Sequence, residues 1–380
     1  MILVVGSSTR MLVQSLATSH RVFSLDSYGD YDTCELAIGW KNIGNKKNEI
    51  DASKFLLLFK QITTKFSPVG WILGSGLENN SEIINNADKI LFRYGISYQQ
   101  MRNVRNPGFF FDTLNKLGIN YPQTILSNHG RSSSKGWLWK DFHSSGGSGI
   151  SRKKANKSKS QGLYLQKELI GRSLSAFFLV ENNSIYIFGF CENISKSFNE
   201  SPYYYHGVKG PVKLTTKVTK YIITNLNKIS SEFGLLGLNG LDFIVLGEEV
   251  FILEINPRPT SALEIFEASY NCSIINLHCN VFRNTQNPKK NRQVKFFPNK
   301  FINDKVYASK VIYALENTKL DELFFERIKN MPFCRDIPRS KFFQAGDPIC
   351  SIMVESPNFY SLDSVINRHE DMVLSIIKKC

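Results

Sequence analysis

The chain has few cysteines, and they lack the spacings of a metal site. Its seven cysteines form no Cys-x-x-Cys pair, and any disulfide pairing would leave one over. A disulfide framework and a zinc site are therefore both disfavoured, and a reducing compartment is favoured. We expect Cys272, Cys279 and His278 to pack on a helix rather than to bind a metal.

Long apolar runs are also missing. No stretch approaches the ~18 apolar residues that a membrane span needs, and the amino end, MILVVG, has too short an apolar run and no basic region for a signal peptide. We therefore expect a soluble, cytoplasmic protein without a membrane partner.

Acidic residues are outnumbered by basic ones. The 33 Asp and Glu against 47 Lys and Arg give a formal net charge of +14, which attracts nucleic acid, acidic membranes or phosphorylated ligands. Lysine is spread along the whole chain beside abundant Asn and Ile, so a biased base composition of the genome explains the charge equally well. No RNP-like motif is present, and nucleic acid is the less favoured partner. The 380 residues, 42% of them hydrophobic, suffice for two or three globular domains.

Several familiar catalytic motifs are absent. The strand predicted at 2–5 leads through a tight turn into a helix at 11–17, but no Gly-x-Gly-x-x-Gly follows it. No Walker A sequence occurs, and no Ser-His-Asp or Cys-His arrangement stands out. A dinucleotide site and covalent catalysis by a side chain are therefore not indicated.

The most informative stretch that is present runs from Gly237 to Glu267. Two alternating runs, 238–246 and 250–256, flank a Gly-containing turn and predict a β-hairpin centred on Glu248. The opposite pairs predicted on one face are Leu246 with Val250, Asp242 with Glu254 and Gly240 with Asn256. The other face is predicted to enter the core with Phe243, Val245, Phe251, Leu253 and Ile255.

Two opposed carboxylates on this hairpin call for a cation, because like charges facing each other cost some tenths to ~1 kcal/mol. Oxygen ligands from Asp242, Glu254 and the Asn256 amide leave room for water and phosphate oxygens, which suits Mg²⁺ better than Ca²⁺. A solvated acidic face neutralised by Lys and Arg is the alternative, and spacing alone does not choose. Arg258 lies close enough to reach the same anion, and Ser261 is a candidate N-cap for a helix at 262–268.

A Gly/Ser loop, 144–150, follows a strand predicted at 137–140 that ends in Lys140. Backbone N–H groups of such a loop can cradle a phosphate, and the nearby ammonium adds positive charge. A flexible linker has the same composition. The basic run 152–159 is interpreted as a solvated loop, with closure over a phosphate chain as the alternative.

The amino-terminal part is predicted to be a small parallel α/β layer with strands at 2–5, 21–25 and 70–73. Loops at 27–33 and 74–78 follow two of these strands at their carboxyl ends, where open α/β sheets place their ligands. The acidic residues of the first loop are candidates for substrate binding or, equally, turn formers.

Taken together, the hairpin with Asp242 and Glu254-Ile255-Asn256-Pro257-Arg258 resembles the metal-binding strands of the ATP-grasp superfamily. The loops at 27–33 and 74–78 resemble the predicted ATP-dependent carboligases related to biotin carboxylase. The resemblance implies that Asp242, Glu254 and Asn256 hold one or two Mg²⁺ ions, which Mn²⁺ can replace, and that Arg258 steadies an anionic substrate or intermediate.

The same resemblance implies an ATP site. Arg105 lies in the basic lead-in to the linker helix expected at 109–117 and would reach the phosphates, with an ordinary surface arginine as the alternative. Lys140 and the loop residues Gly146, Gly147, Ser148 and Gly149 would hold the triphosphate. The strand at 163–166 runs into a hinge whose residues, Gln166, Lys167, Glu168 and Leu169, would meet adenine and ribose. Arg172 departs from the acidic residue that many relatives carry just after the hinge glycine.

The fold implied is a mixed α/β and α+β chain in three parts. Residues 1–100 would form the α/β substrate domain that precedes the ATP-grasp domain, 101–290 the ATP-grasp domain, and 291–380 a small β-rich closing domain. The aromatic stretch 201–207 is expected to form a loop covering the cleft.

The activity implied is an ADP-forming ligase that activates a carboxylate as an acyl phosphate and joins it to an amine, with Lys140 and Arg258 as its catalytic residues. The partners are small carboxylates and amines, with a homodimer as the candidate assembly. The subgroup also resembles ligases of one-carbon cofactor biosynthesis, of the methanofuran and tetrahydromethanopterin type. A bicarbonate-dependent carboxylase and a non-catalytic nucleotide- or RNA-binding protein are the alternatives.

Overall fold

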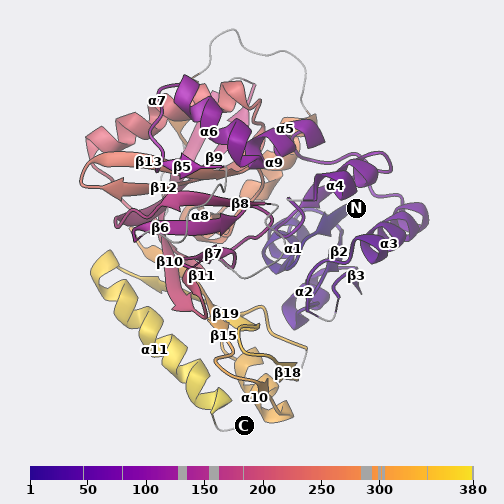
Figure 1. Cartoon of the computed structure of the whole chain (residues 1–380). Helices are drawn as coiled ribbons and strands as arrows, with labels where there is room; N and C mark the ends of the chain where they lie inside the picture. Colours follow the sequence, from indigo (N-terminus) through magenta and orange to yellow (C-terminus); the bar gives the residue numbers. More distant parts are fainter. Residues whose placement is uncertain are drawn as a thin grey trace.

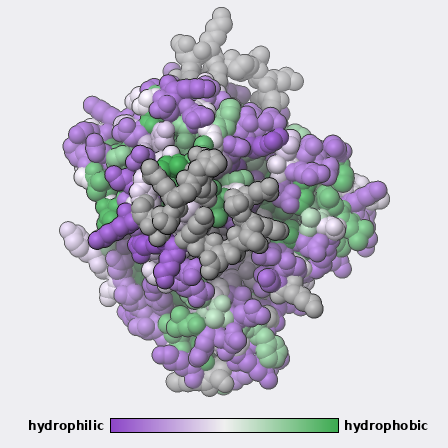
Figure 2. Space-filling view, viewed as in Figure 1, coloured by the Kyte–Doolittle hydropathy of each residue, from purple (hydrophilic) through white to green (hydrophobic). Residues whose placement is uncertain are grey.

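The computed structural model describes residues 1–378 except 46, 79, 127–134, 154–161, 183, 284–292, 298–300, 302–303 and 340. Most of the basic run 152–159, interpreted as a solvated loop with closure over a phosphate chain as the alternative, therefore lies outside the described residues. Figure 1 shows an amino-terminal region beside a larger central region, with the carboxyl-terminal elements below both. On the face in Figure 2, hydrophobic residues form small groups among hydrophilic ones.

The amino-terminal region is a parallel sheet with the strand order β3-β2-β1-β4. Strands β1 and β4 are apolar and fully buried, as is typical of a parallel sheet covered by helices. This confirms the predicted α/β layer. The elements are β1 (Ile2–Val5), α1 (Arg10–Ala17), β2 (Val22–Asp26), α2 (Tyr31–Leu36), β3 (Gly39–Asn42), α3 (Ala52–Phe66), β4 (Gly70–Leu73) and α4 (Ser81–Asp88).

The loops after these strands meet at one edge of the sheet. The amide N–H of Ser7 donates to the carbonyl of Ser75 at 2.7 Å, and that of Ser27 donates to the carbonyl of Ser7 at 3.0 Å. Asp26 is a turn former: its buried carboxylate accepts from the hydroxyl of Thr9 at 2.7 Å and from the indole N–H of Trp40 at 2.6 Å. The convergence of the loops matches the sequence-based prediction.

Two helices lead into the central region. The first begins with a capping box between Ser97 and Gln100, and the second has a proline at its start, where no intrahelical donor is lost. A small antiparallel sheet with the order β5-β8-β6-β7 follows. The elements are α5 (Tyr98–Arg105), α6 (Pro107–Lys116), β5 (Thr124–Ile125), β6 (Trp137–Asp141), β7 (Ile150–Ser151) and β8 (Leu163–Lys167).

The largest sheet has the order β13-β12-β9-β10-β11-β15-β19-β17, with β14 beside β10. Strands from the carboxyl-terminal region thus extend the sheet that carries the hairpin. Its central strands are β9 (Arg172–Glu181), β10 (Ser184–Phe198), β11 (Ser201–Gly210), β12 (Gly237–Leu246), β13 (Glu249–Asn256) and β14 (Gln293–Phe296). Helices α7 (Thr216–Glu232), α8 (Ala262–Tyr270) and α9 (Ile274–Arg283) belong to the same region.

The carboxyl-terminal elements have a separate apolar cluster that includes Phe324, Ile352 and Leu362. The long helix α11 packs on this part of the sheet (Figure 1). The elements are β15 (Val306–Tyr313), β16 (Thr318–Lys319), α10 (Glu322–Lys329), β17 (Cys334–Arg335), β18 (Phe342–Phe343), β19 (Pro348–Ser356) and α11 (Phe359–Ile377).

The stretch 201–207 is not a cover loop. It lies in β11, which pairs with β10 on one side and β15 on the other. Its tyrosines suit a strand, and the distant partner β15, which sequence proximity does not reveal, holds it in the sheet. The prediction was wrong because a non-local pairing overrode the local turn signals.

The hairpin β12–β13 has the predicted register at one end and a different register at the other. Gly240 faces Asn256 and Asp242 faces Glu254, but a β-bulge follows, so that Leu246 pairs with Glu249 instead of Val250. The bulge reverses the alternation beyond it. Val250 and Ile252 therefore enter the core, whereas Phe251 and Leu253, predicted to be core residues, are only partly buried.

Candidate active site

A cavity of about 700 Å³ lies where the amino-terminal loops, the small sheet and the hairpin meet. Eleven of the fourteen residues predicted for the site line it, drawn from six parts of the sequence. They are Arg105, Lys140, Gly146, Gly147, Gln166, Lys167, Leu169, Asp242, Glu254, Asn256 and Arg258.

The acidic pair, Asp242 on β12 and Glu254 on β13, lines this cavity where it meets the hairpin. Asn256 donates from its side-chain amide to Asp242 at 3.0 Å and to Glu254 at 3.4 Å. Burial, together with the adjacent Glu254, raises the pKa of Asp242 to about 8. Glu254 lines the cavity and 49% of its side chain is exposed, so its carboxylate is open to a ligand.

Two basic side chains stand beside this pair. Arg105 donates to Glu254 at 3.3 Å, and only 15% of its side chain is exposed, so it is not an ordinary surface arginine. Burial lowers the pKa of Lys140, against the opposite influence of Glu254 and Asp242. Burial also disfavours ionised Glu254, but Arg105 and Lys140 hold its pKa below the usual value. The cavity wall therefore combines fixed positive charge with a carboxylate pair.

The Gly/Ser loop is held against β11. The carbonyl of Gly146 accepts from the Tyr205 amide at 2.9 Å, and that of Gly147 accepts from the Ser201 hydroxyl at 2.7 Å. Gly147 has a φ of +75°, and a Cβ there would lie 2.0 Å from the Tyr203 carbonyl oxygen, so only glycine fits.

Three predicted ATP-site residues do not line the cavity. Ser148 and Gly149 turn away because the loop closes on itself: the hydroxyl of Ser148 donates to the carbonyl of Ser145 at 2.9 Å, and the carbonyl of Gly149 accepts from the Asp141 amide at 3.0 Å. Glu168 is held outside, where its carboxylate accepts from Arg152 and from the Tyr203 hydroxyl, each at 2.6 Å. The rest of the hinge faces inward.

Hinge residues Gln166, Lys167 and Leu169 line the cavity, while part of their hydrogen bonding is internal. The Gln166 side chain donates to the Thr124 hydroxyl at 3.0 Å, and the Lys167 amide donates to the carbonyl of Gln123 at 2.8 Å. The Lys167 amide is therefore engaged, so a base edge at this hinge would have to use other backbone groups.

Arg258 pairs with Glu78, which the sequence analysis did not single out as a site residue. Its guanidinium donates to the Glu78 carboxylate, and the two side chains are only 15% and 6% exposed. Burial disfavours the charged form of Glu78, but Arg258 and Arg105 hold its pKa below the usual value. The pair joins the hairpin end to the loop after β4. The sequence marked the loop at 74–78 as a candidate for ligand binding, but it gave no sign that Glu78 in this loop pairs with Arg258.

Ser261 begins α8 but makes no side-chain cap. Its hydroxyl instead shares a 2.5 Å hydrogen bond with the hydroxyl of Tyr205 on β11. The predicted N-cap was wrong because a tertiary partner competes for the same oxygen. Tyr205 also lines the cavity and was missed, since the aromatic stretch was assigned to a loop.

The buried histidine packs as expected. The ring nitrogen Nδ1 of His278 accepts from the Leu238 amide at 2.9 Å, and Nε2 donates to the carbonyl of Tyr94 at 2.8 Å. Burial lowers the pKa of His278 to about 4, so the ring is neutral. Cys279 is buried beside it, and neither is placed as a ligand.

The donor set of the acidic pair fits a small divalent cation. Asp242 and Glu254 face each other across the ladder and repel, and carboxylate and amide oxygens are ligands that Mg²⁺ accepts. Only two of these ligands are carboxylates; across the described residues, no group of three or more His, Cys, Asp or Glu side chains could hold a metal ion.

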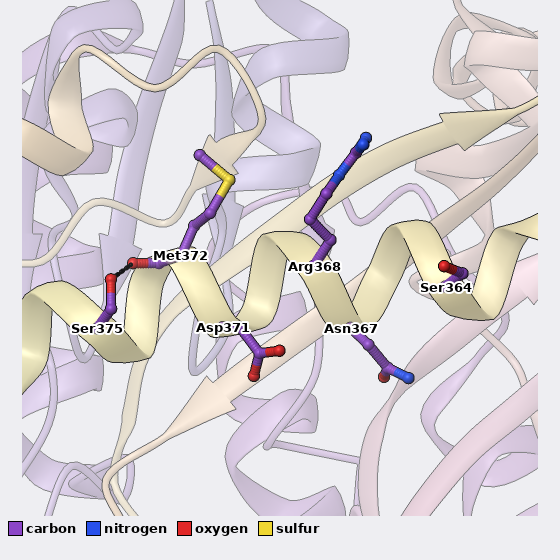
Figure 3. A pocket seen from close by; sticks show the side chains of 6 residues that line it. All are labelled: Ser364, Asn367, Arg368, Asp371, Met372 and Ser375. Carbon is purple, nitrogen blue, oxygen red and sulfur yellow. Dashed lines mark hydrogen bonds between the residues drawn. The ribbon is translucent and has the colours of Figure 1, made fainter.

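A shallow hollow on α11 is the other recess of note (Figure 3). All six of its lining residues come from this one helix, with Asp371 and Arg368 pointing to different sides. It encloses nothing, and we assign it no function. Within the part of the chain that the structure describes, no helix has both the length and the apolarity to span a membrane.

A cleft that sets a carboxylate pair of a β-hairpin against a glycine loop and a hinge strand is the arrangement expected from the resemblance to the ATP-grasp superfamily. Residues 107–262 match the family model described as the ATP-grasp domain. The resemblance to the ATP-grasp superfamily seen in the sequence is thus confirmed for residues 107–262.

A relative with a similar sequence is an uncharacterized protein of Methanocaldococcus jannaschii, 23% identical over 391 residues that cover 96% of this chain and 90% of the relative. Among solved structures, the biotin carboxylase domain of Hydrogenobacter thermophilus 2-oxoglutarate carboxylase superposes with a TM-score of 0.70 at 13% identity, covering 98% of this chain and 89% of that one. That structure contains MgADP and bicarbonate.

Two further structures share the fold over their whole lengths. The L-amino acid ligase of Bacillus licheniformis has a TM-score of 0.67 at 12% identity and covers 97% of both chains. The N5-carboxyaminoimidazole synthase of Aspergillus clavatus has a TM-score of 0.64 at 13% identity, covering 100% of this chain and 98% of that one. At such identities the likeness establishes the fold alone.

Proposed function

We propose that this protein is an ADP-forming ligase that activates a carboxylate with ATP and joins it to an amine. The observation that carries the proposal is the opposed pair Asp242 and Glu254, which lines one cavity together with Lys140 and Arg105. A solvated acidic face, the alternative weighed from sequence, would not surround the pair with protein and basic side chains.

The chain's own groups have distinct tasks in this proposal. Asp242, Glu254 and Asn256 would hold Mg²⁺, which supplies charge screening for the phosphate oxygens when it is bound. Lys140, Arg105 and the backbone of Gly146 and Gly147 would hold the triphosphate in line for transfer.

The chemistry proceeds in two balanced steps. An oxygen of the carboxylate substrate attacks the γ-phosphorus, and the bond to the ADP oxygen breaks, giving an acyl phosphate. The amine nitrogen then attacks the acyl carbon, a C–N bond forms, the nitrogen loses a proton, and inorganic phosphate leaves. Arg258 would steady the negative charge on the acyl oxygen, held in place by Glu78.

Hydroxylamine tests the first step without knowledge of the natural amine, because it converts an acyl phosphate into a stable hydroxamate. Pools of carboxylates would be incubated with protein, ATP, Mg²⁺ and hydroxylamine, and hydroxamate and ADP would be measured together. We expect equal amounts of both with at least one pool. ADP formed without any hydroxamate would contradict carboxylate activation.

Carboxylation with bicarbonate is a second candidate, favoured by the fold shared with a biotin carboxylase domain that holds bicarbonate and MgADP. It predicts ADP release that depends on bicarbonate and incorporation of labelled bicarbonate into an acceptor. Dependence on an organic carboxylate instead would exclude it.

The identity of the substrates, the oligomeric state and the cellular location are proposed from the sequence resemblance alone. Carboxylates and amines of one-carbon cofactor biosynthesis are the substrates that we propose to screen first. A homodimer and a cytoplasmic location also stay predictions, which light scattering and cell fractionation would test.

A further inference from the structure

A second cluster of charged residues lines the other end of the same cavity. It combines Arg10 of the amino-terminal region with Glu264 of α8 and Asp336 of the carboxyl-terminal region, and Asp30 and Asp32 stand beside it. The three regions of the fold therefore meet at this point. Of these residues, only Asp30 and Asp32 lie in the loop at 27–33 that the sequence marks as a candidate.

Arg10 has no donor to spare for a substrate anion. Its Nε and Nη2 donate to Asp336 at 3.1 and 3.3 Å, and its Nη1 and Nη2 donate to Glu264 at 2.5 and 3.2 Å. The remaining Nη1 hydrogen goes to Gln14 at 3.0 Å. A guanidinium has five N–H donors, and all five are used within the protein.

The carboxylates outnumber this single cation. Glu264 and Asp336 share the charge of Arg10, and Asp32 lies 3.9 Å from it while accepting the amides of Asp336 and Ile337 at 2.9 and 3.1 Å. Four carboxylates thus face one guanidinium. The pocket is short of positive charge even before a ligand enters.

Asp30 is the group left without a partner. It is only 6% exposed and lines the cavity, yet among the described residues no hydrogen bond or ion pair reaches its carboxylate. Burial and the nearby Asp336, Asp26 and Asp32 raise its pKa, against the opposite effect of Arg10. A buried carboxyl without a partner is costly, so it marks a place where a ligand donor belongs.

We infer that this pocket binds the acceptor of the ligase as a cationic amine, with an ammonium group against Asp30. That the bound amine is the second substrate rests on the proposed function. The test does not depend on it, because amine binding is measured without turnover. The chemistry selects the class. An ammonium supplies both the N–H donors that Asp30 lacks and the missing charge, whereas a carboxylate acceptor would meet only like charges and an arginine already engaged.

A matched series of probes tests the charge that the pocket selects. Binding of butylamine, 1-butanol and butanoate to the full-length protein would be measured by calorimetry, with 1,4-diaminobutane as a dication. We expect the amines to bind and the alcohol to bind at least tenfold more weakly; about tenfold corresponds to 1.4 kcal/mol. Butanoate can enter only the proposed carboxylate subsite, so its binding should be the same in the wild type and in Asp30→Asn. No amine binding by the wild type, or equal binding of the alcohol, would overturn the inference.

The Asp30→Asn variant locates the site. It keeps the size of the side chain and removes no hydrogen bond of the folded protein, so its melting temperature is expected to be unchanged or higher. Butylamine affinity should fall at least tenfold, while Asp371→Asn, at the exposed hollow of α11, should bind as the wild type does. If Asp30→Asn binds butylamine normally, the pocket is not the amine site.

MgATP binding, measured on the same samples, separates the two proposals. Asp30 lies outside the proposed ATP site, so Asp30→Asn should bind MgATP like the wild type, which also reports that the variant is folded. MgATP binding without amine binding refutes this inference alone. Amine binding without MgATP binding supports the pocket and refutes the proposed ligase.

Discussion

Replacing Glu254 with glutamine separates a metal-binding role from a structural one. The change keeps the shape of the side chain and removes one charge of the opposed pair. A unit charge pair at about 4 Å near a protein surface interacts by about 4 kcal/mol. If the proposed Mg²⁺ site loses that much in the transition state, ADP release should fall about a thousandfold.

Stability should respond in the opposite way. Glu254 raises the pKa of Asp242, so replacing Glu254 relieves repulsion inside the cavity. Arg105 would lose its ion pair with Glu254, but the Glu78 carboxylate would remain nearby to balance its charge. We expect the melting temperature without Mg²⁺ to stay within a few degrees of the wild type or to rise, since 1 kcal/mol shifts it by about 2–4 °C in a chain of this kind.

Three measurements would decide the matter: ADP release, the melting temperature without metal, and the increase in melting temperature that Mg²⁺ adds to ADP binding. Glu249→Gln is the matched control, because Glu249 stands on the same strand at its exposed end. The variant Glu254→Gln should lose both the activity and the Mg²⁺ increment, and Glu249→Gln neither. Equal activity of the two variants would refute the reasoning.

Three further predictions follow from single contacts. Lys140→Met should weaken ATP binding by about 1.5–3 kcal/mol, the value of a hydrogen bond to a charged group, and unchanged affinity in a fluorescence titration would remove Lys140 from the site. Arg258→Ala strands the buried Glu78 carboxylate and should cost about 3–5 kcal/mol of unfolding free energy, part of which Glu78→Gln should restore in the double variant; equal urea midpoints for single and double variants would refute the pairing. Burial raises the pKa of Glu267 to about 7 from 4.5, so the folded state keeps a proton that the unfolded state has lost, and stability should fall by about 3 kcal/mol as the pH rises from 4.5 to 7. Glu267→Gln should show less of this decline, and an unchanged pH profile in urea unfolding would contradict the assignment.

The sequence by itself determined the hairpin with its carboxylate pair, the glycine loop after Lys140 and the parallel layer of the amino-terminal region. Each of these is a local pattern: strand alternation places Asp242 and Glu254 on one face, and glycine is required where φ is positive, as at Gly147. Local chemistry specifies such features without reference to long-range contacts.

Only the tertiary structure decided which distant side chains pair. The strand made of the aromatic stretch at 201–207 and the partners of Arg258 and Arg10 depend on elements far apart in the sequence. The bulge that sends Val250 into the core lies within the hairpin, but the alternation of the sequence does not mark it. Spacing carries no information about such contacts, because chain folding, not sequence order, brings Glu78 to Arg258 and Asp336 to Arg10. The amine pocket exists only where all three regions meet.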